Sequence, residues 1–73
     1  MYYLAVFRAR TQTLMFDNIL KSYGVPTSVI NTPRSINVSC GLSVKFDISF
    51  KNTADSIINR RRFDSFVGFY LVK

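Results

Sequence analysis

The sequence LSVKFD, from Leu42 to Asp47, carries the clearest secondary-structure signal in the chain. Leu42, Val44 and Phe46 are apolar, whereas the residues between them are polar or charged. Because successive side chains of a strand point to opposite faces, this alternation predicts a strand with one buried face and one solvated face.

The residues that precede this strand indicate a strand, a helix and a second strand. YYLAVFRA, from Tyr2 to Ala9, is short and rich in aromatic and β-branched residues, which predicts a central strand. Apolar residues then recur at helical spacing over residues 12–23, with Thr11 as the expected N-cap and Gly24 as the C-terminal stop. Residues 25–31 predict a short strand, which we place at an edge of the sheet because Pro26 lies near its start.

The residues that follow the strand indicate a helix and a last strand. A helical stripe of apolar residues begins at Phe50, and either Asp47 or Ser49 is available as its cap. Arg60, Arg61 and Arg62 close the expected helix, where cations complement the helix dipole. Residues 66–72 predict the final strand.

The predicted order of elements is strand, helix, strand, strand, helix, strand, which is the order of the ferredoxin-like fold. We therefore expect an α+β protein, one domain over residues 1–73, with a four-stranded antiparallel sheet and two helices on one face. The other face would be open, and we expect aromatic residues there: Tyr2 or Tyr3, Phe69 and Tyr70. A homodimer formed through this face would cover it.

The composition is that of a folded, strongly basic protein. Hydrophobic residues make up 48% of the 73 residues, which argues against intrinsic disorder. The formal net charge of +6 favours acidic partners, either nucleic acid or an acidic protein surface. No apolar run approaches the length of a membrane span and no basic leader opens the chain, so we expect a cytoplasmic protein that does not bind a membrane.

The inventory of reactive side chains excludes many classes of enzyme. The chain has no His, no Glu and a single Cys, which leaves no set of ligands for a zinc site and no pair of carboxylates for glycoside hydrolysis. Its three glycines form no phosphate-binding motif. We therefore expect no metal, no cofactor and no enzymatic activity.

Cys40 is the strongest chemical candidate that remains, in the predicted loop between Thr32 and Gly41. A thiolate alone can attack a sulfane sulfur, so this residue could carry sulfur or selenium as a persulfide or perselenide. We expect Arg34 to stabilise the thiolate, and Pro33, Ser39 and Gly41 to support the loop. The alternative is that Cys40 is a small hydrophobic core residue, as free cysteines often are.

The same segment resembles the Se/S carrier protein-like family, whose members are small bacterial proteins of unknown biochemical activity. The resemblance rests on Thr32-Pro33-Arg34, on Val38-Ser39-Cys40-Gly41-Leu42 and on Lys45-Phe46, and it extends over nearly the whole chain. Val38, and Ser35 where an acidic residue often follows the arginine, depart from the commoner forms. The resemblance implies that Cys40 carries sulfur or selenium. Because of the +6 charge, we expect the donor or acceptor to be an acidic protein.

Two other functions remain open on the sequence. A βαββαβ sheet with aromatic residues and a high positive charge is also the general plan of an RNA-recognition domain. Residues 41–46 count against that function, because they offer aliphatic residues and a single Phe where such domains place alternating aromatics. The second alternative is a small interaction or regulatory module that acts through the open sheet face.

Overall fold

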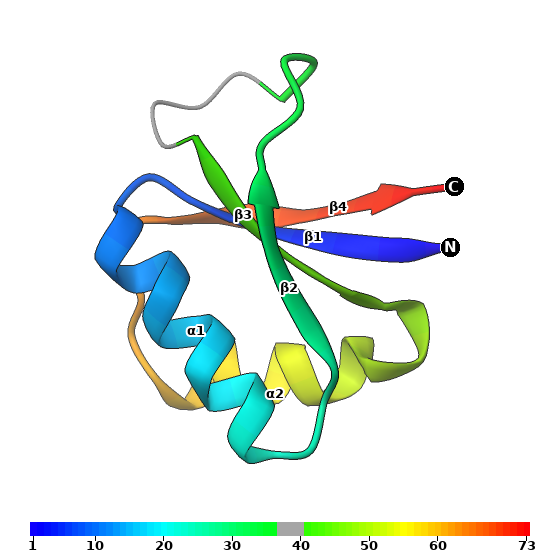
Figure 1. Cartoon of the computed structure of the whole chain (residues 1–73). Helices are drawn as coiled ribbons and strands as arrows, with labels where there is room; N and C mark the ends of the chain where they lie inside the picture. The colour runs from blue at the N-terminus through cyan, green and yellow to red at the C-terminus, as the bar shows by residue number, and fades with distance from the viewer. Residues whose placement is uncertain (37–40) are drawn as a thin grey trace.

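The computed structural model describes residues 1–36 and 41–73, and its elements follow the expected βαββαβ order (Figure 1). They are strand β1 (Tyr2–Phe7), helix α1 (Arg10–Ser22), strands β2 (Thr27–Asn31) and β3 (Leu42–Asp47), the short 3₁₀ helix η1 (Ile48–Phe50), helix α2 (Lys51–Arg60) and strand β4 (Phe66–Val72).

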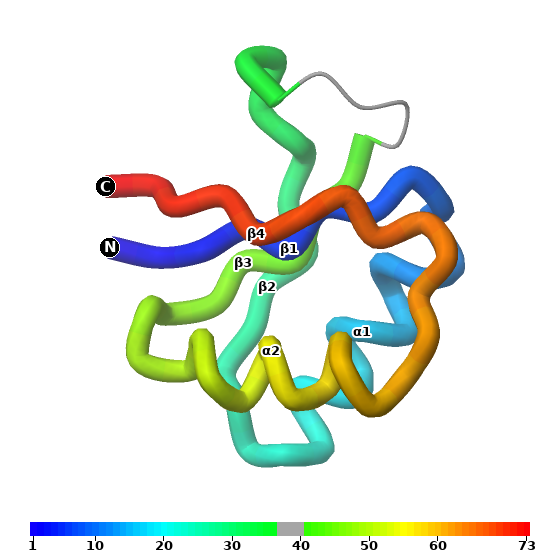
Figure 2. The backbone as a smooth tube through the Cα atoms, turned by 180° about the vertical axis from the view of Figure 1, so that it is seen from behind, coloured from blue at the N-terminus to red at the C-terminus, as the bar shows by residue number. Residues whose placement is uncertain are grey.

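The four strands form one antiparallel sheet in the order β2-β3-β1-β4. β1 is central and β2 lies at an edge, which confirms both sequence predictions. Tyr2 pairs with Asp47 at one end of the β1–β3 ladder and Val6 pairs with Ser43 near the other. The end of β1 and the start of β3 therefore lie at the same edge of the molecule, beside the β1–α1 turn, as both views show (Figures 1 and 2).

The hydrophobic core lies between the sheet and the two helices. It joins residues of β1 and β3 to residues of both helices: Ala5, Phe7, Phe16, Leu20, Val25, Val44, Phe46, Ala54 and Ile57. The ring of Phe7 lies 5.3 Å from the ring centroid of Phe16, 5.3 Å from Phe63 and 5.2 Å from Phe66. Aromatic packing of this kind adds to the stabilisation from apolar burial, so the helices are held on one face of the sheet, as predicted.

Helix α1 ends as predicted but starts earlier than predicted. The residue before its first turn is Ala9, not Thr11, and no side chain caps the helix there. At the other end Gly24 has φ = 80°, its N–H donates to the Lys21 carbonyl, and the Val25 N–H donates to the Leu20 carbonyl. These two bonds form a Schellman motif, in which a glycine takes the left-handed conformation.

Asp47 caps the second helical segment. Its carboxylate accepts hydrogen bonds from the Ser49 N–H at 2.9 Å and from the Ser49 hydroxyl at 2.6 Å, at the start of η1. η1 leads directly into α2, which ends at Arg60, the first residue of the triple arginine. All three arginines are exposed, and the prediction that they close the helix is confirmed for Arg60, since Arg61 is the C-cap and Arg62 follows it.

The sheet face opposite the helices differs from the prediction. Of the aromatic residues expected there, Tyr2 or Tyr3, Phe69 and Tyr70, only Phe69 contradicts the prediction, because it packs against the core together with Tyr3, whose ring lies 6.0 Å from Phe46. Tyr2 and Tyr70 alternate with these two core residues and so lie on the opposite face. Leu4 and Val6 alternate with core residues of β1 and so point to the opposite face, yet both are fully buried. Because Leu4 and Val6 are buried, the apolar area exposed to solvent on this face is smaller than the sequence indicated.

Candidate functional site

The connection between β2 and β3, residues 32–41, is fastened at its base. The ladder pairs Asn31 with Leu42, and one step further the Thr32 N–H donates to the Gly41 carbonyl at 2.7 Å. The hydroxyls of Thr32 and Ser43 are 2.6 Å apart, also within hydrogen-bond distance. Gly41, the residue that follows Cys40 in the chain, is therefore anchored to the sheet.

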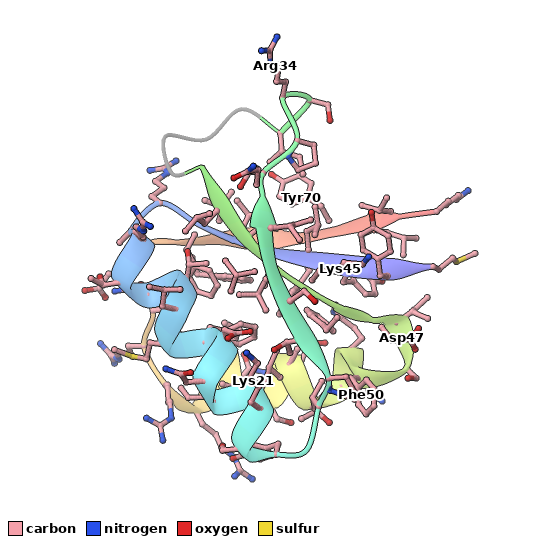
Figure 3. The ribbon with its side chains drawn as sticks, viewed as in Figure 1. Lys21, Arg34, Lys45, Asp47, Phe50 and Tyr70 are labelled. Carbon is pink, nitrogen blue, oxygen red and sulfur yellow. The ribbon has the colours of Figure 1, made fainter. Side chains whose placement is uncertain are left out.

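The first half of this connection makes a turn from Pro33 to Ile36, in which the Ile36 N–H donates to the Pro33 carbonyl at 3.0 Å. Arg34 is exposed at the tip of the turn and its side chain points away from the sheet (Figure 3). Neither ion pair among the described residues involves it. Ser39 and Cys40 lie outside the described residues, so the expected action of Arg34 on the thiolate remains a prediction.

Gly41 is exposed and its surroundings are open. Apart from its chain neighbours, a Cβ atom built on Gly41 would meet no described atom within 4 Å. The described residues therefore do not require a glycine here to avoid a clash. Because Gly41 has no side chain, it leaves open space in a pocket that it helps to line.

That pocket, of about 480 Å³, is lined by residues from the β1–α1 turn and from both ends of the β2–β3 connection. They are Arg8, Arg10, Asn31, Gly41 and Leu42, and we call this set the Arg8–Arg10 pocket. Arg8 follows β1 directly and is held by its N–H, which donates to the Ser65 carbonyl at 2.8 Å. Arg10 is the first residue of α1.

The described lining of the Arg8–Arg10 pocket carries two positive charges and no negative charge. None of its lining residues is acidic, and neither arginine takes part in the ion pairs found among the described residues. The first turn of α1 also contains no acidic residue, so the positive end of the helix dipole at Arg10 is not compensated by a neighbouring carboxylate.

The four aspartates of the chain are placed elsewhere. Asp17 is buried and pairs with Lys21 at 3.0 Å, Asp55 pairs with Lys51 at 2.8 Å, and Asp47 binds Ser49. Asp64 is exposed and does not line the pocket. Arg8 and Arg10, which line the same pocket as the residue that follows Cys40, therefore make no ion pair with any aspartate.

The sequence reasoning did not identify Arg8 and Arg10. The signal that could have found them was the predicted topology, because antiparallel pairing of the first and third strands places the end of one beside the start of the other. Two arginines directly after the first strand then lie beside the loop that precedes the third strand. The sequence prediction named Arg34 as the cation that stabilises the thiolate, because Arg34 is close to Cys40 along the chain.

A second concavity, of about 270 Å³, lies at the opposite end of the β1–β3 ladder. Its lining includes Tyr2, Lys45 and Asp47. The Lys45 ammonium lies 4.3 Å from the centroid of the Tyr2 ring, in a cation–π contact. The pKa of the Asp47 carboxyl is lowered below its ordinary value because it accepts the hydrogen bonds of Ser49.

In the described part of the chain, no group of three or more His, Cys, Asp or Glu residues could hold a metal ion. Among residues 1–36 and 41–73, no helix has the length and apolar character needed to cross a membrane.

Comparison with known proteins assigns the family. A family model described as "putative Se/S carrier protein-like" matches residues 2–64 of the 73-residue chain. The chain belongs to this family. Neither the comparison with curated proteins nor the comparison with solved structures found a match. The family match spans the first three strands, both helices and the whole β2–β3 connection with Cys40, and its description agrees with the resemblance drawn from the sequence.

Proposed function

We propose that this member of the Se/S carrier protein-like family carries sulfur or selenium on Cys40, as a persulfide or perselenide. The observation that supports the proposal most is the family match over residues 2–64, which includes the one cysteine of the chain. A lone cysteine suits a carrier because no second thiol in the same chain can resolve the persulfide into an intramolecular disulfide.

The loading step needs a thiolate and a sulfane sulfur. The Cys40 thiolate attacks the outer sulfur of a donor persulfide, a new S–S bond forms, and the bond between the two donor sulfurs breaks. The donor thiolate leaves with the electron pair, so no external oxidant or reductant is needed. The reverse of this exchange on an acceptor thiolate unloads the carrier.

The surroundings of Cys40 in the chain favour this chemistry. Nearby cations lower the pKa of a thiol, and three arginines are candidates: Arg34 in the same connection, and Arg8 and Arg10 in the pocket that Gly41 helps to line. The excess of cations over aspartates gives the protein a net charge of +6, which favours an acidic donor or acceptor protein.

The nucleic-acid alternative has less support. Stacking of bases requires aromatic rings that are free on the open sheet face. Tyr3 and Phe69 pack against the core instead, and the Tyr2 ring contacts Lys45, which leaves Tyr70 as the exposed ring among these four.

The test is to expose the native protein to a low-molecular-weight persulfide and to measure intact mass before and after addition of an acceptor thiol. We expect the mass of one sulfur atom to be gained and then lost. The Cys40→Ser variant, which keeps the size of the side chain and removes the thiolate, should gain nothing. A native thiol that gains no sulfur, although it reacts fully after unfolding, would contradict the proposal.

A further inference from the structure

The Arg8–Arg10 pocket combines three properties of an anion site. It is concave, with a volume of about 480 Å³. It is lined by two arginines from different elements, the β1–α1 turn and the first turn of α1, and neither makes an ion pair with a described residue. Asn31, whose side chain carries a hydrogen-bond donor, also lines it.

Arg8 and Arg10 have no counter-ion among the described residues, because the few aspartates of the chain lie outside the pocket and three of them bind other residues. Asp17 and Asp55 are held by lysines, and Asp47 is held by Ser49. Two arginines within one pocket repel each other, and this cost is reduced when an anion binds between them. The site is therefore complementary to a ligand with concentrated negative charge.

We propose that the Arg8–Arg10 pocket binds a small tetrahedral oxyanion of the sulfate and phosphate class. The planar guanidinium presents parallel N–H donors that match two oxygens of such an anion, and two guanidiniums match its double charge. The wall formed by Leu42 is apolar and lowers the local dielectric, which strengthens these bonds. The site consists of described residues only and does not depend on the reactivity of Cys40.

The pocket also suggests a class of sulfur donor, and this extension rests on the proposed function. Thiosulfate is a tetrahedral oxyanion that carries a sulfane sulfur. When the Cys40 thiolate attacks that outer sulfur, a new S–S bond forms, the bond to the sulfonate sulfur breaks, and sulfite leaves with the electron pair. Arginines that hold the sulfonate oxygens would stabilise the charge that develops on sulfite.

The experiment is a titration of the protein with sulfate, phosphate and thiosulfate at constant ionic strength, followed by the backbone amide NMR signals of Asn31, Gly41 and Leu42. The Cys40→Ser variant is titrated in parallel, so that no covalent step contributes. We expect saturable shifts at these amides in both proteins. The double variant Arg8→Gln/Arg10→Gln should bind about tenfold more weakly or worse, because it loses charge-assisted hydrogen bonds.

The matched control is Arg61→Gln/Arg62→Gln, which removes the same charge from exposed residues after α2. It should change the affinity less than about twofold, because exposed charges outside the pocket act only through a screened field. Equal weakening in the two double variants would overturn the proposal, and so would shifts that rise linearly without saturation.

The outcomes also separate the oxyanion site from the carrier function. Saturable binding to Cys40→Ser supports the oxyanion site even if the native thiol never accepts sulfur. Loading of Cys40 by a persulfide together with linear anion shifts would overturn the site and leave the carrier function standing. Binding of a single-stranded oligonucleotide at these amides without saturation by any of the small anions would also overturn the site.

Discussion

The helix-covered face of the sheet and the Arg8–Arg10 pocket differ in burial and in charge. On the helix-covered face, rings such as those of Phe7 and Phe16 are fully buried and contact one another. In the pocket, Arg8 and Arg10 are exposed and carry charges without a counter-ion among the described residues. The buried rings stabilise the fold. We expect the exposed arginines of the pocket to contribute little to that stability.

This difference predicts how substitutions should behave. A change in the core should cost stability whatever its effect on function, whereas a change in the pocket should alter binding and leave the fold intact. Functional tests therefore belong in the pocket and the β2–β3 connection, where variants are expected to fold.

The largest expected effect is that of Phe7→Ala. Phe7 is fully buried and its ring contacts three other phenylalanine rings, so its truncation should lower the free energy of unfolding by about 3–5 kcal/mol. A loss of this size approaches the whole stability of a small domain, and equilibrium denaturation would measure it. The exposed Tyr23, truncated in Tyr23→Ala, should change the value by only about 0.5 kcal/mol. Similar losses in both variants would refute the assignment of Phe7 to the core.

An intermediate effect is expected from a pair of glycine substitutions. Gly24→Ala places a Cβ in the left-handed conformation of the Schellman motif, which should cost about 1–2 kcal/mol in the free energy of unfolding. Apart from its chain neighbours, the Cβ of Gly41→Ala would meet no described atom within 4 Å, so this variant should be near neutral in the same denaturation experiment. The opposite ranking of the two variants would show that the β2–β3 connection is under greater conformational constraint than the turn after α1.

The smallest expected effect concerns the pH dependence at Asp47. Its pKa is lowered from the ordinary value of 3.8 in the folded protein, so the unfolded chain binds a proton more readily. The stabilisation is thus fully present above about pH 4 and is lost as the pH falls through the lowered pKa. Ser49→Ala removes the hydroxyl that donates to Asp47. Thermal melts should show a small difference between wild type and variant near pH 6, which shrinks in acid; a difference that grows in acid would contradict the cause given for the pKa.

Most of the fold could be predicted from the sequence, because its signals are local and agree with one another. The alternation from Leu42 to Asp47, the helical stripes and the stop at Gly24 each depend on neighbouring residues only. The start of α1 was missed because it has no capping side chain. Phe69 was placed on the wrong face, and the choice between Tyr2 and Tyr3 was left open, because a strand that is apolar on both sides does not indicate which side the helices cover.

The site was predictable only in part. Cys40 was found by elimination, because a chain with one Cys and no His or Glu has few other side chains that could be reactive. Arg8 and Arg10 were not found, because a pocket formed by the end of one strand and the start of another has no local signature.

The most direct test of the carrier function is the pH dependence of Cys40 alkylation in the native protein, with the denatured protein as the reference. We predict that the native thiol reacts and titrates below the value of about 8.5 that is usual for a free cysteine, because of the cations in its vicinity. Arg34→Gln and Arg8→Gln/Arg10→Gln then show which arginines are responsible, since the pKa rises when an effective cation is removed. A thiol that resists alkylation until the protein unfolds would identify Cys40 as a buried structural residue and would contradict the carrier function.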